Sequence, residues 1–390
     1  MTWDNTTLFS DDNPPDLAFR AEVRDWMEAN VPRELCNRPD RFGPTELKPW
    51  HRKLYERGWI APHWPKEYGG MGATLTQQII LFEEITRLGA PTPFPHGLNF
   101  FGPILIEAGT PEQKAKHLPS ILTGETTWCQ GYSESSAGSD LASLTTRAVL
   151  DGDHFIVNGH KLWTTNGHHA DWMFALVRTD PDARPRHAGI SMLLIDLKSP
   201  GVTVKPIRTL RGDAEFAEEF FDDVRVPAGN LVGKLNDGWR VANRVLGSER
   251  FTTGHPRNAA VMLNRAREVA KISGAIRDPV FLLQLALLEM DLLAFTAFYR
   301  HAAALLGLGR APQSMAPVIK IAGGEIGQKA SELLMQAAGP LGPLTSDLRT
   351  EAGAVNVAAD LFDMRRLTVG SGTVEIQRNV IAKRVLNLPD

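Results

Sequence analysis

Two short segments carry side chains that could hold a flat or an anionic ligand. The first, Tyr132 to Asp140 (YSESSAGSD), is rich in serine, and such a loop offers backbone N–H groups and hydroxyls with little steric bulk. The second, Trp163 to Gly167 (WTTNG), sets an aromatic plane beside two hydroxyls. Taken alone, each segment is more often a surface turn or a strand end with a packed tryptophan. The residues by themselves leave both interpretations open.

Other familiar chemistries find little support in the sequence. His160, His168 and His169 have no carboxylate or cysteine at metal-ligand spacing, so we expect solvated histidines and no metal. Cys36 and Cys129 cannot form a disulfide framework, which fits a reducing cytosol. No GxGxxG follows an expected strand, and neither a Walker A sequence nor a GxSxG elbow occurs. A Rossmann dinucleotide site is therefore not expected.

Composition and charge narrow the class of protein. The chain has 390 residues, enough for two or three domains. Its net charge of −3 creates no global field that attracts nucleic acid or an anionic membrane. The polar, acidic N-terminus resembles neither a signal peptide nor an Arg-rich transit peptide. We therefore expect a cytoplasmic protein that does not bind nucleic acid.

Helical patterns precede the two segments. Phe19, Val23, Trp26 and Met27 share one face of an expected helix, with Asp16 as its N-cap. Helix starts are expected at Thr45 and at Thr110, where Pro111 and Gln113 complete a capping box. Another helix is expected from Thr74 to Leu88. Residues 1–125 are thus predicted to form an N-terminal α-helical domain.

The pattern changes after Glu125, in the stretch that contains both segments. Ala148 to Val157 alternates around Asp151-Gly152, which indicates a hairpin. Further strands are expected at Trp172–Val177, Ile190–Leu197, Val202–Ile207 and Glu219–Val226. These predict an antiparallel, barrel-like middle β-domain at residues 126–238.

Helix formers dominate from Trp239 onward. The longest apolar run, Val280 to Leu308, carries Gln284, Glu289 and Asp291, so a helix inside a bundle is expected rather than a membrane span. Residues 239–390 are predicted to form a C-terminal four-helix bundle. The fold class is therefore mainly α with a central β-domain.

Six stretches occur in the order found in the acyl-CoA dehydrogenase family, which the chain resembles over almost its whole length. They are WPKEYGGMGA (Trp64–Ala73), GTPEQKAKHLPSILTGE (Gly109–Glu125), SESSAGSD (Ser133–Asp140), VNGHKLWTTNG (Val157–Gly167), FFDDVRVPAGNLVG (Phe220–Gly233) and GTVEIQRNVIAKRVL (Gly372–Leu386). The C-terminal tail is similar to bacterial members, including those acting on branched or steroid-derived acyl-CoA thioesters.

The resemblance implies a reaction and its partners. The family binds FAD non-covalently and removes the α and β hydrogens of an acyl-CoA thioester to give the 2-enoyl-CoA, as in β-oxidation and other lipid metabolism. Electrons pass to an electron-transferring flavoprotein. Subunits assemble as dimers or tetramers, with themselves or with a homologous subunit.

The resemblance also implies site residues by position. Those expected at the flavin are Tyr132, Ser133, Trp163, Thr164, Thr165, Gly372 and Thr373. Those expected at the adenosine and pyrophosphate of a neighbouring subunit's FAD are Gln336, Gly339 and Pro340. Those expected at the substrate are Ser139, near the CoA chain, and Arg250, at the acyl-CoA entrance.

The catalytic base requires a choice between two positions. Many members carry a glutamate in a C-terminal loop, where this chain has Ser371, which cannot act as a base unaided. Other members place the glutamate on the helix after the β-domain, beside an arginine, and this chain has Glu249 there. We predict Glu249 as the base; the alternative is an ordinary helical carboxylate paired with an arginine.

Three departures from the family pattern keep other functions open. Ser135-Ser136 replaces Pro-Gly, Ile272 to Pro279 lacks an Arg-x-x-Phe segment, and Glu375 replaces a glutamine. The chain could instead be a non-catalytic or half-site subunit of a heteromeric acyl-CoA dehydrogenase. A flavin monooxygenase or oxidase on the same scaffold is the other alternative.

Overall fold

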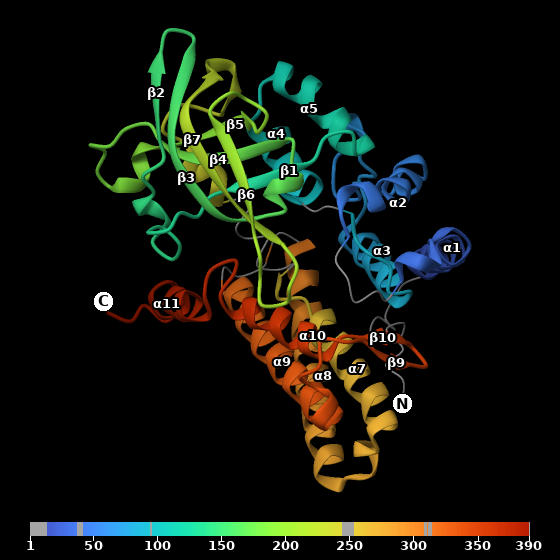
Figure 1. The fold of residues 1–390 in the computed structure, drawn as a ribbon. Coiled ribbons are helices and arrows are strands. Elements are labelled where there is room, and N and C mark those ends of the chain that lie inside the picture. The colour runs from blue at the N-terminus through green and yellow to red at the C-terminus, as the bar shows by residue number, and fades with distance from the viewer. Residues whose placement is uncertain are drawn as a thin grey trace. The chain divides into compact units, whose positions relative to one another are not determined.

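The computed structural model describes residues 14–36, 42–93, 96–243, 253–307, 310 and 314–389. These fold into two compact units (Figure 1). One unit takes its described residues from Met1–Arg41, Ala73–Pro91 and Ser248–Asp390, and the other from Phe42–Gly72 and Thr92–Gly247. Each unit thus joins segments that are far apart in the sequence. The predicted domain boundaries at 125 and 238 follow the chain linearly and stay a prediction.

The unit that contains the sheet has eight strands. They are β1 (Trp128–Gly131), β2 (Arg147–Asp151), β3 (His154–Thr165), β4 (Trp172–Arg178), β5 (Ile190–Asp196), β6 (Val202–Ile207), β7 (Phe216–Pro227) and β8 (Leu231–Val232). The order across the sheet is β6-β7-β3-β2-β4-β5-β8, with β1 paired to β4. The predicted hairpin around Asp151-Gly152 is confirmed as β2–β3.

The expectation of a wholly antiparallel sheet is wrong at strand β4, which has two parallel pairings. Strand β4 runs parallel to β1 and meets β2 in a parallel bridge. Parallel neighbours need a long connection, and the chain between β1 and β4 provides it by forming the β2–β3 hairpin. The sheet is therefore mixed, and the ends of β1 and β3 come close together.

Three helices belong to the same unit as the sheet. They are α2 (Pro44–Glu56), α4 (Gly102–Ala108) and α5 (Pro111–Thr123). Phe101, which precedes α4, stacks on Trp128 of β1 with ring centroids 4.0 Å apart. The predicted capping box at Thr110 and Gln113 is confirmed. The N-cap of α2 is Gly43 rather than Thr45, because Pro44 fits the first helical position, where a missing N–H costs no hydrogen bond.

The second unit is helical. Its helices are α1 (Pro14–Asn30), α3 (Leu75–Arg87), α7 (Arg257–Ser273), α8 (Pro279–Gly307), α9 (Met315–Ala338), α10 (Val357–Arg365) and α11 (Val374–Arg384). Helices α7, α8 and α9 run side by side, as the yellow to orange ribbons of Figure 1 show. A short hairpin of β9 (Leu348–Thr350) and β10 (Gly353–Val355) was not predicted. Asp16 lies in the first turn of α1 rather than at its N-cap, because α1 begins at Pro14.

Helix α8 is long and apolar enough to cross a membrane by length and composition. Phe281, Leu285 and Leu292 on one side of it are buried in the core that α7 and α9 share. Large apolar side chains on its other side are exposed: Val280, Leu282, Leu283, Leu287, Met290 and Leu293. Because one face is built into the bundle, α8 belongs to the core of this helical unit, as the sequence predicted.

Candidate functional site

The structure brings the segments Tyr132–Asp140 and Trp163–Gly167 together. Tyr132 and Ser133 follow β1 directly, and the backbone N–H of Leu162 in β3 donates to the Ser133 carbonyl at 3.0 Å. Trp163, Thr164 and Thr165 complete β3 beyond that contact. The five residues expected at the flavin ring from this unit therefore lie on two neighbouring stretches of backbone.

A buried ion pair holds these two stretches in place. Lys161 Nζ lies 2.8 Å from Glu134 Oε1 and also donates to the Tyr132 carbonyl at 3.1 Å. Glu134 receives further hydrogen bonds from Thr145 and from the Thr146 backbone. Burial opposes ionisation of Glu134, but the Lys161 ammonium and these hydrogen bonds prevail and lower its pKa to about 2. This ion pair was not predicted from the sequence.

The end of β3 has an unusual backbone. Trp163 has a φ of +64° and Asn166 a φ of +56°, both in the left-handed region. The β3–β7 register shifts between Leu162 and Thr164, so a bulge turns the Trp163 side chain outward. Its side chain is 56% exposed and meets the edge of Phe216. The indole face is thus available to a ligand, although Trp163 belongs to strand β3.

Beneath this bulge lies a second buried carboxyl group. Thr164 Oγ1 donates to Glu219 Oε2 of β7 at 2.6 Å, and Glu219 has no solvent exposure. Burial, with a smaller contribution from the charge of Glu218, raises the pKa of Glu219 to about 8, against the opposing effects of the Thr164 hydrogen bond and Lys161. The sequence did indicate that Glu219 is buried. It lies two residues from both Ala217 and Phe221, which are buried, and alternate residues of a strand face the same side.

The helical unit holds the other expected flavin residues. Gly372 has a φ of +82°, and Thr373 caps α11 by accepting a hydrogen bond from the Ile376 N–H. Gln377 is fully buried, and its Oε1 atom has no partner among the residues that the structure describes. A buried amide oxygen of this kind favours an external donor nearby.

Gln336, Gly339 and Pro340 lie at the C-terminal end of α9 and are exposed. Arg378 of α11 pairs with Glu325 of α9, which is about 16 Å from Gln336 along the helix axis. Within one chain, these three residues are therefore not brought together with Gly372 and Thr373. This separation is compatible with the expectation that they serve a neighbouring subunit's FAD.

The two residues expected to act on the substrate chemistry, Glu249 and Arg250, lie outside the described residues. Ser139 is exposed at the end of the loop that begins at Tyr132. Among the described parts of the chain, no group of three or more His, Cys, Asp or Glu side chains could hold a metal ion.

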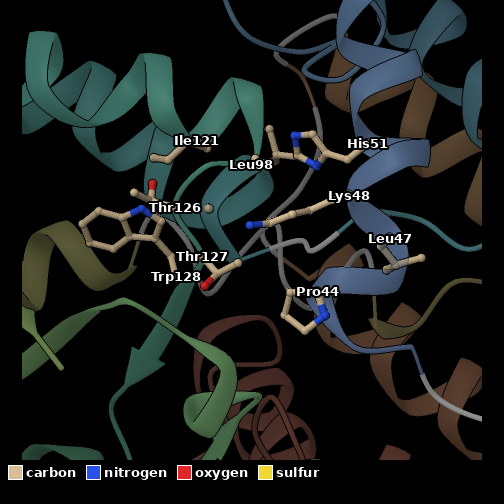
Figure 2. Close-up of a pocket in the computed structure, with 11 residues that line it drawn as sticks. Pro44, Leu47, Lys48, His51, Leu98, Ile121, Thr126, Thr127 and Trp128 are labelled. Atoms are coloured by element: carbon tan, nitrogen blue, oxygen red, sulfur yellow. The ribbon is translucent and has the colours of Figure 1, made fainter. Parts of the chain in front are cut away.

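A small pocket opens elsewhere in the sheet-containing unit (Figure 2). Lys48 and His51 of α2, Ile121 of α5 and Trp128 of β1 are among its lining residues. Its volume of about 30 Å³ accommodates a water molecule or two, but not a flavin ring or an acyl chain. None of the predicted site residues lines it.

The chain matches one protein family along nearly its whole length. Residues 13–125 match the acyl-CoA dehydrogenase N-terminal domain, residues 129–224 its middle domain and residues 236–386 its C-terminal domain. The chain therefore belongs to the acyl-CoA dehydrogenase family.

Individual relatives agree with this assignment. The acyl-CoA dehydrogenase IpdE1 of Mycolicibacterium smegmatis is 38% identical over 392 residues, covering 95% of this chain and 97% of the relative. The solved Tcur3481–Tcur3483 steroid ACAD superposes with a TM-score of 0.85 at 30% identity, covering 97% and 98% of the two chains. The ChsE4–ChsE5 complex from Mycobacterium tuberculosis gives 0.82 at 30% identity, covering 98% and 99%. The protein is an acyl-CoA dehydrogenase, an oxidoreductase that uses FAD.

The described residues fit a flavin. Trp163 offers an exposed aromatic face, and the hydroxyls of Ser133 and Thr165 stand half-buried on the adjoining stretches. In the helical unit, Gln377 Nε2 donates to the Gly372 carbonyl at 3.4 Å, and Oε1 of the same side chain has no partner within the described ranges. A ring system with both donor and acceptor atoms suits the indole and the hydroxyls of the sheet-containing unit.

Proposed function

We propose that this chain dehydrogenates a steroid-derived acyl-CoA thioester between its α and β carbons. The observation that carries the proposal is similarity over nearly the full chain to the Tcur3481–Tcur3483 steroid ACAD, at 30% identity. FAD, when bound, supplies the acceptor for the electrons and the β hydrogen. An electron-transferring flavoprotein would then reoxidise the enzyme in the cytoplasm.

Several residues would hold the cofactor. Tyr132, Ser133, Trp163, Thr164 and Thr165 would support the flavin ring from the sheet-containing unit. The positions available at the helical unit are Gly372 and Thr373, with Gln336, Gly339 and Pro340 for the FAD of a neighbouring subunit. The order that the Lys161–Glu134 pair gives to the first group supports this role, since a rigid platform loses little entropy on binding.

Glu249 would act as the catalytic base. An α proton of a thioester is weakly acidic, so the carboxylate that removes it must be made more basic by desolvation. Ser371, at the alternative family position, has no such capacity. Arg250 would face the acyl-CoA entrance, and Ser139 would lie near the CoA chain.

The test is a panel of short, branched, long and steroid-derived acyl-CoA thioesters, read by bleaching of the flavin absorbance without oxygen. We expect rapid bleaching with the steroid-derived thioester and slower bleaching with the others. Bleaching confined to short straight-chain thioesters would contradict the proposed substrate class. A colourless protein that takes up no FAD would contradict the proposed cofactor contacts instead.

The exposed apolar face of α8 would pack against a second acyl-CoA dehydrogenase chain, either a copy or a homologous subunit. Leu283 and Leu287 are 61% and 53% exposed on that face, and contiguous exposed apolar patches usually mark contacts. The solved ChsE4–ChsE5 relative is a complex of two named subunits. That arrangement supports a heteromer as one form of the assembly.

The double substitution Leu283→Glu and Leu287→Glu should convert the assembly to monomers, because each change buries a charge in the contact. Light scattering after size exclusion measures the mass, with and without a co-expressed homologue. Leu210→Glu is the matched control, since Leu210 is 83% exposed in the other unit. An unchanged mass in the double variant would show that α8 does not form the contact.

A further inference from the structure

A fully buried glutamate lies directly under the turn that carries Trp163. Glu219 projects from β7 toward the bulged end of β3, and it accepts the Thr164 hydroxyl hydrogen bond at 2.6 Å. Its other oxygen, Oε1, has no hydrogen-bond partner among the described residues. A buried carboxyl oxygen without a hydrogen-bond partner needs an explanation, because an apolar side chain at this position would cost less free energy.

The same side chain also touches the far end of the turn. A Cβ atom added to Gly167 would stand 2.1 Å from Glu219 Oε1, so only glycine leaves room for the carboxyl group there. Glu219 therefore contacts the turn at two points, by a hydrogen bond to Thr164 and by close packing on Gly167. Between them lie Thr165 and Asn166, and Asn166 has a left-handed backbone.

We propose that Glu219 is a positioning residue, which holds the Trp163–Gly167 turn in the conformation that presents the indole and the Thr165 hydroxyl to the flavin. This inference rests on the proposed flavin contacts. Left-handed backbone is costly at a bulky residue such as Trp163, whereas asparagine, here Asn166, adopts it more readily. A buried anchor on the neighbouring strand offsets that cost.

The neutral acid is the form that suits this role. Burial raises the pKa of Glu219 to about 8, and Glu218 acts in the same direction. Lys161 of β3 opposes them, but its ammonium already pairs with Glu134. Cys129 of β1 also faces this site, and burial, with Glu219 adding to it, raises the thiol's pKa. Well below pH 8, Glu219 is therefore mostly the neutral acid and places little negative charge under the flavin.

Two substitutions separate the effect of losing the hydrogen-bond acceptor from the effect of losing the ionisable group. Glu219→Gln keeps an oxygen that accepts from Thr164, whereas Glu219→Ala leaves the Thr164 hydroxyl without its partner. Asp222→Asn is the matched control, since Asp222 is an exposed carboxylate of the same strand. The full chain is used throughout, with FAD affinity measured by fluorescence titration from pH 6 to 9.

We expect Glu219→Ala to weaken FAD binding about tenfold and Glu219→Gln to stay close to the unchanged protein at pH 7. Above pH 8 the unchanged protein should lose affinity as Glu219 ionises, and Glu219→Gln should not. Equal affinities in all variants across the pH range would overturn the proposal, and so would a loss in Glu219→Gln as large as in Glu219→Ala.

A second measurement does not depend on FAD. Amide hydrogen exchange of the protein without flavin should show faster exchange across residues 163–167 in Glu219→Ala, and unchanged exchange in Glu219→Gln and Asp222→Asn. If the unchanged protein binds no FAD, the proposed flavin contacts fail, and the exchange pattern still decides whether Glu219 holds the turn. Exchange unaltered in Glu219→Ala would overturn the positioning role. If Glu219→Ala does not fold, the comparison of Glu219→Gln with the unchanged protein above pH 8 decides the outcome.

Discussion

Glu249→Gln should lower the rate of flavin bleaching by an acyl-CoA about 10³-fold, because a positioned general base contributes on the order of 10²–10⁴ in rate. The amide keeps the size of the side chain but cannot accept the α proton. FAD content and the affinity for the 2-enoyl-CoA product should change little. Stopped-flow absorbance under anaerobic conditions measures the rate, and equilibrium titration measures the two affinities.

A compensating variant makes this test sharper. Other family members place the glutamate where this chain has Ser371, and Ser371 already adopts a φ of +57°. The double variant Glu249→Gln, Ser371→Glu should therefore regain part of the lost rate. Glu332→Gln, a change at an exposed carboxylate of α9 that pairs with Arg365, serves as the control. Full activity in Glu249→Gln would remove Glu249 as the base.

Lys161→Met should destabilise the protein by about 3–5 kcal/mol, the usual cost of leaving a buried charge without its partner. Lys161 has no exposure, and among the described residues Glu134 would keep the hydrogen bonds from Thr145 and Thr146 alone. Urea denaturation followed by tryptophan fluorescence measures the free energy of unfolding. Lys205→Met, at an exposed lysine of β6, should change it far less.

The same pair predicts a dependence on pH. The pKa of Glu134 lies at about 2 in the folded protein, below its ordinary value of 4.5. A lowered carboxyl pKa stabilises the fold above the ordinary value, and that contribution is lost as the pH falls through about 2. As the pH falls from 4.5 to about 2, the unchanged protein should lose stability more steeply than a Lys161→Met, Glu134→Gln double variant. Parallel curves would contradict a charged pair.

Local signals in the sequence predicted the elements best. The capping box at Thr110 and Gln113 and the turn at Asp151-Gly152 involve residues a few positions apart, and both occur as expected. The parallel pairing of β1 with β4 could not be predicted in this way, because it joins residues more than forty positions apart. Register between distant strands depends on the packing of the whole sheet.

In the candidate site too, local features were predictable from the sequence and contacts between distant residues were not. The WTTNG segment and the loop after β1 were singled out from their composition, and the structure brings them together. The left-handed backbone of Trp163 was not predicted, since nothing in the residue type favours it. It follows from a bulge against β7 and from contacts with Glu219, which lies 55 residues beyond Thr164 along the chain.

The way the chain alternates between its two units has a consequence for synthesis on the ribosome. Arg20 of α1 pairs with Glu83 of α3, yet the helices that complete their unit begin only after Ser248. At about 5–20 residues per second, the roughly 150 residues between Pro91 and Ser248 take about 8–30 s to emerge. During that interval the apolar faces of α1 and α3 stay exposed to solvent, while the sheet-containing unit can already form. We therefore expect α1 and α3 to be the segments of the nascent chain that a chaperone would bind during this interval.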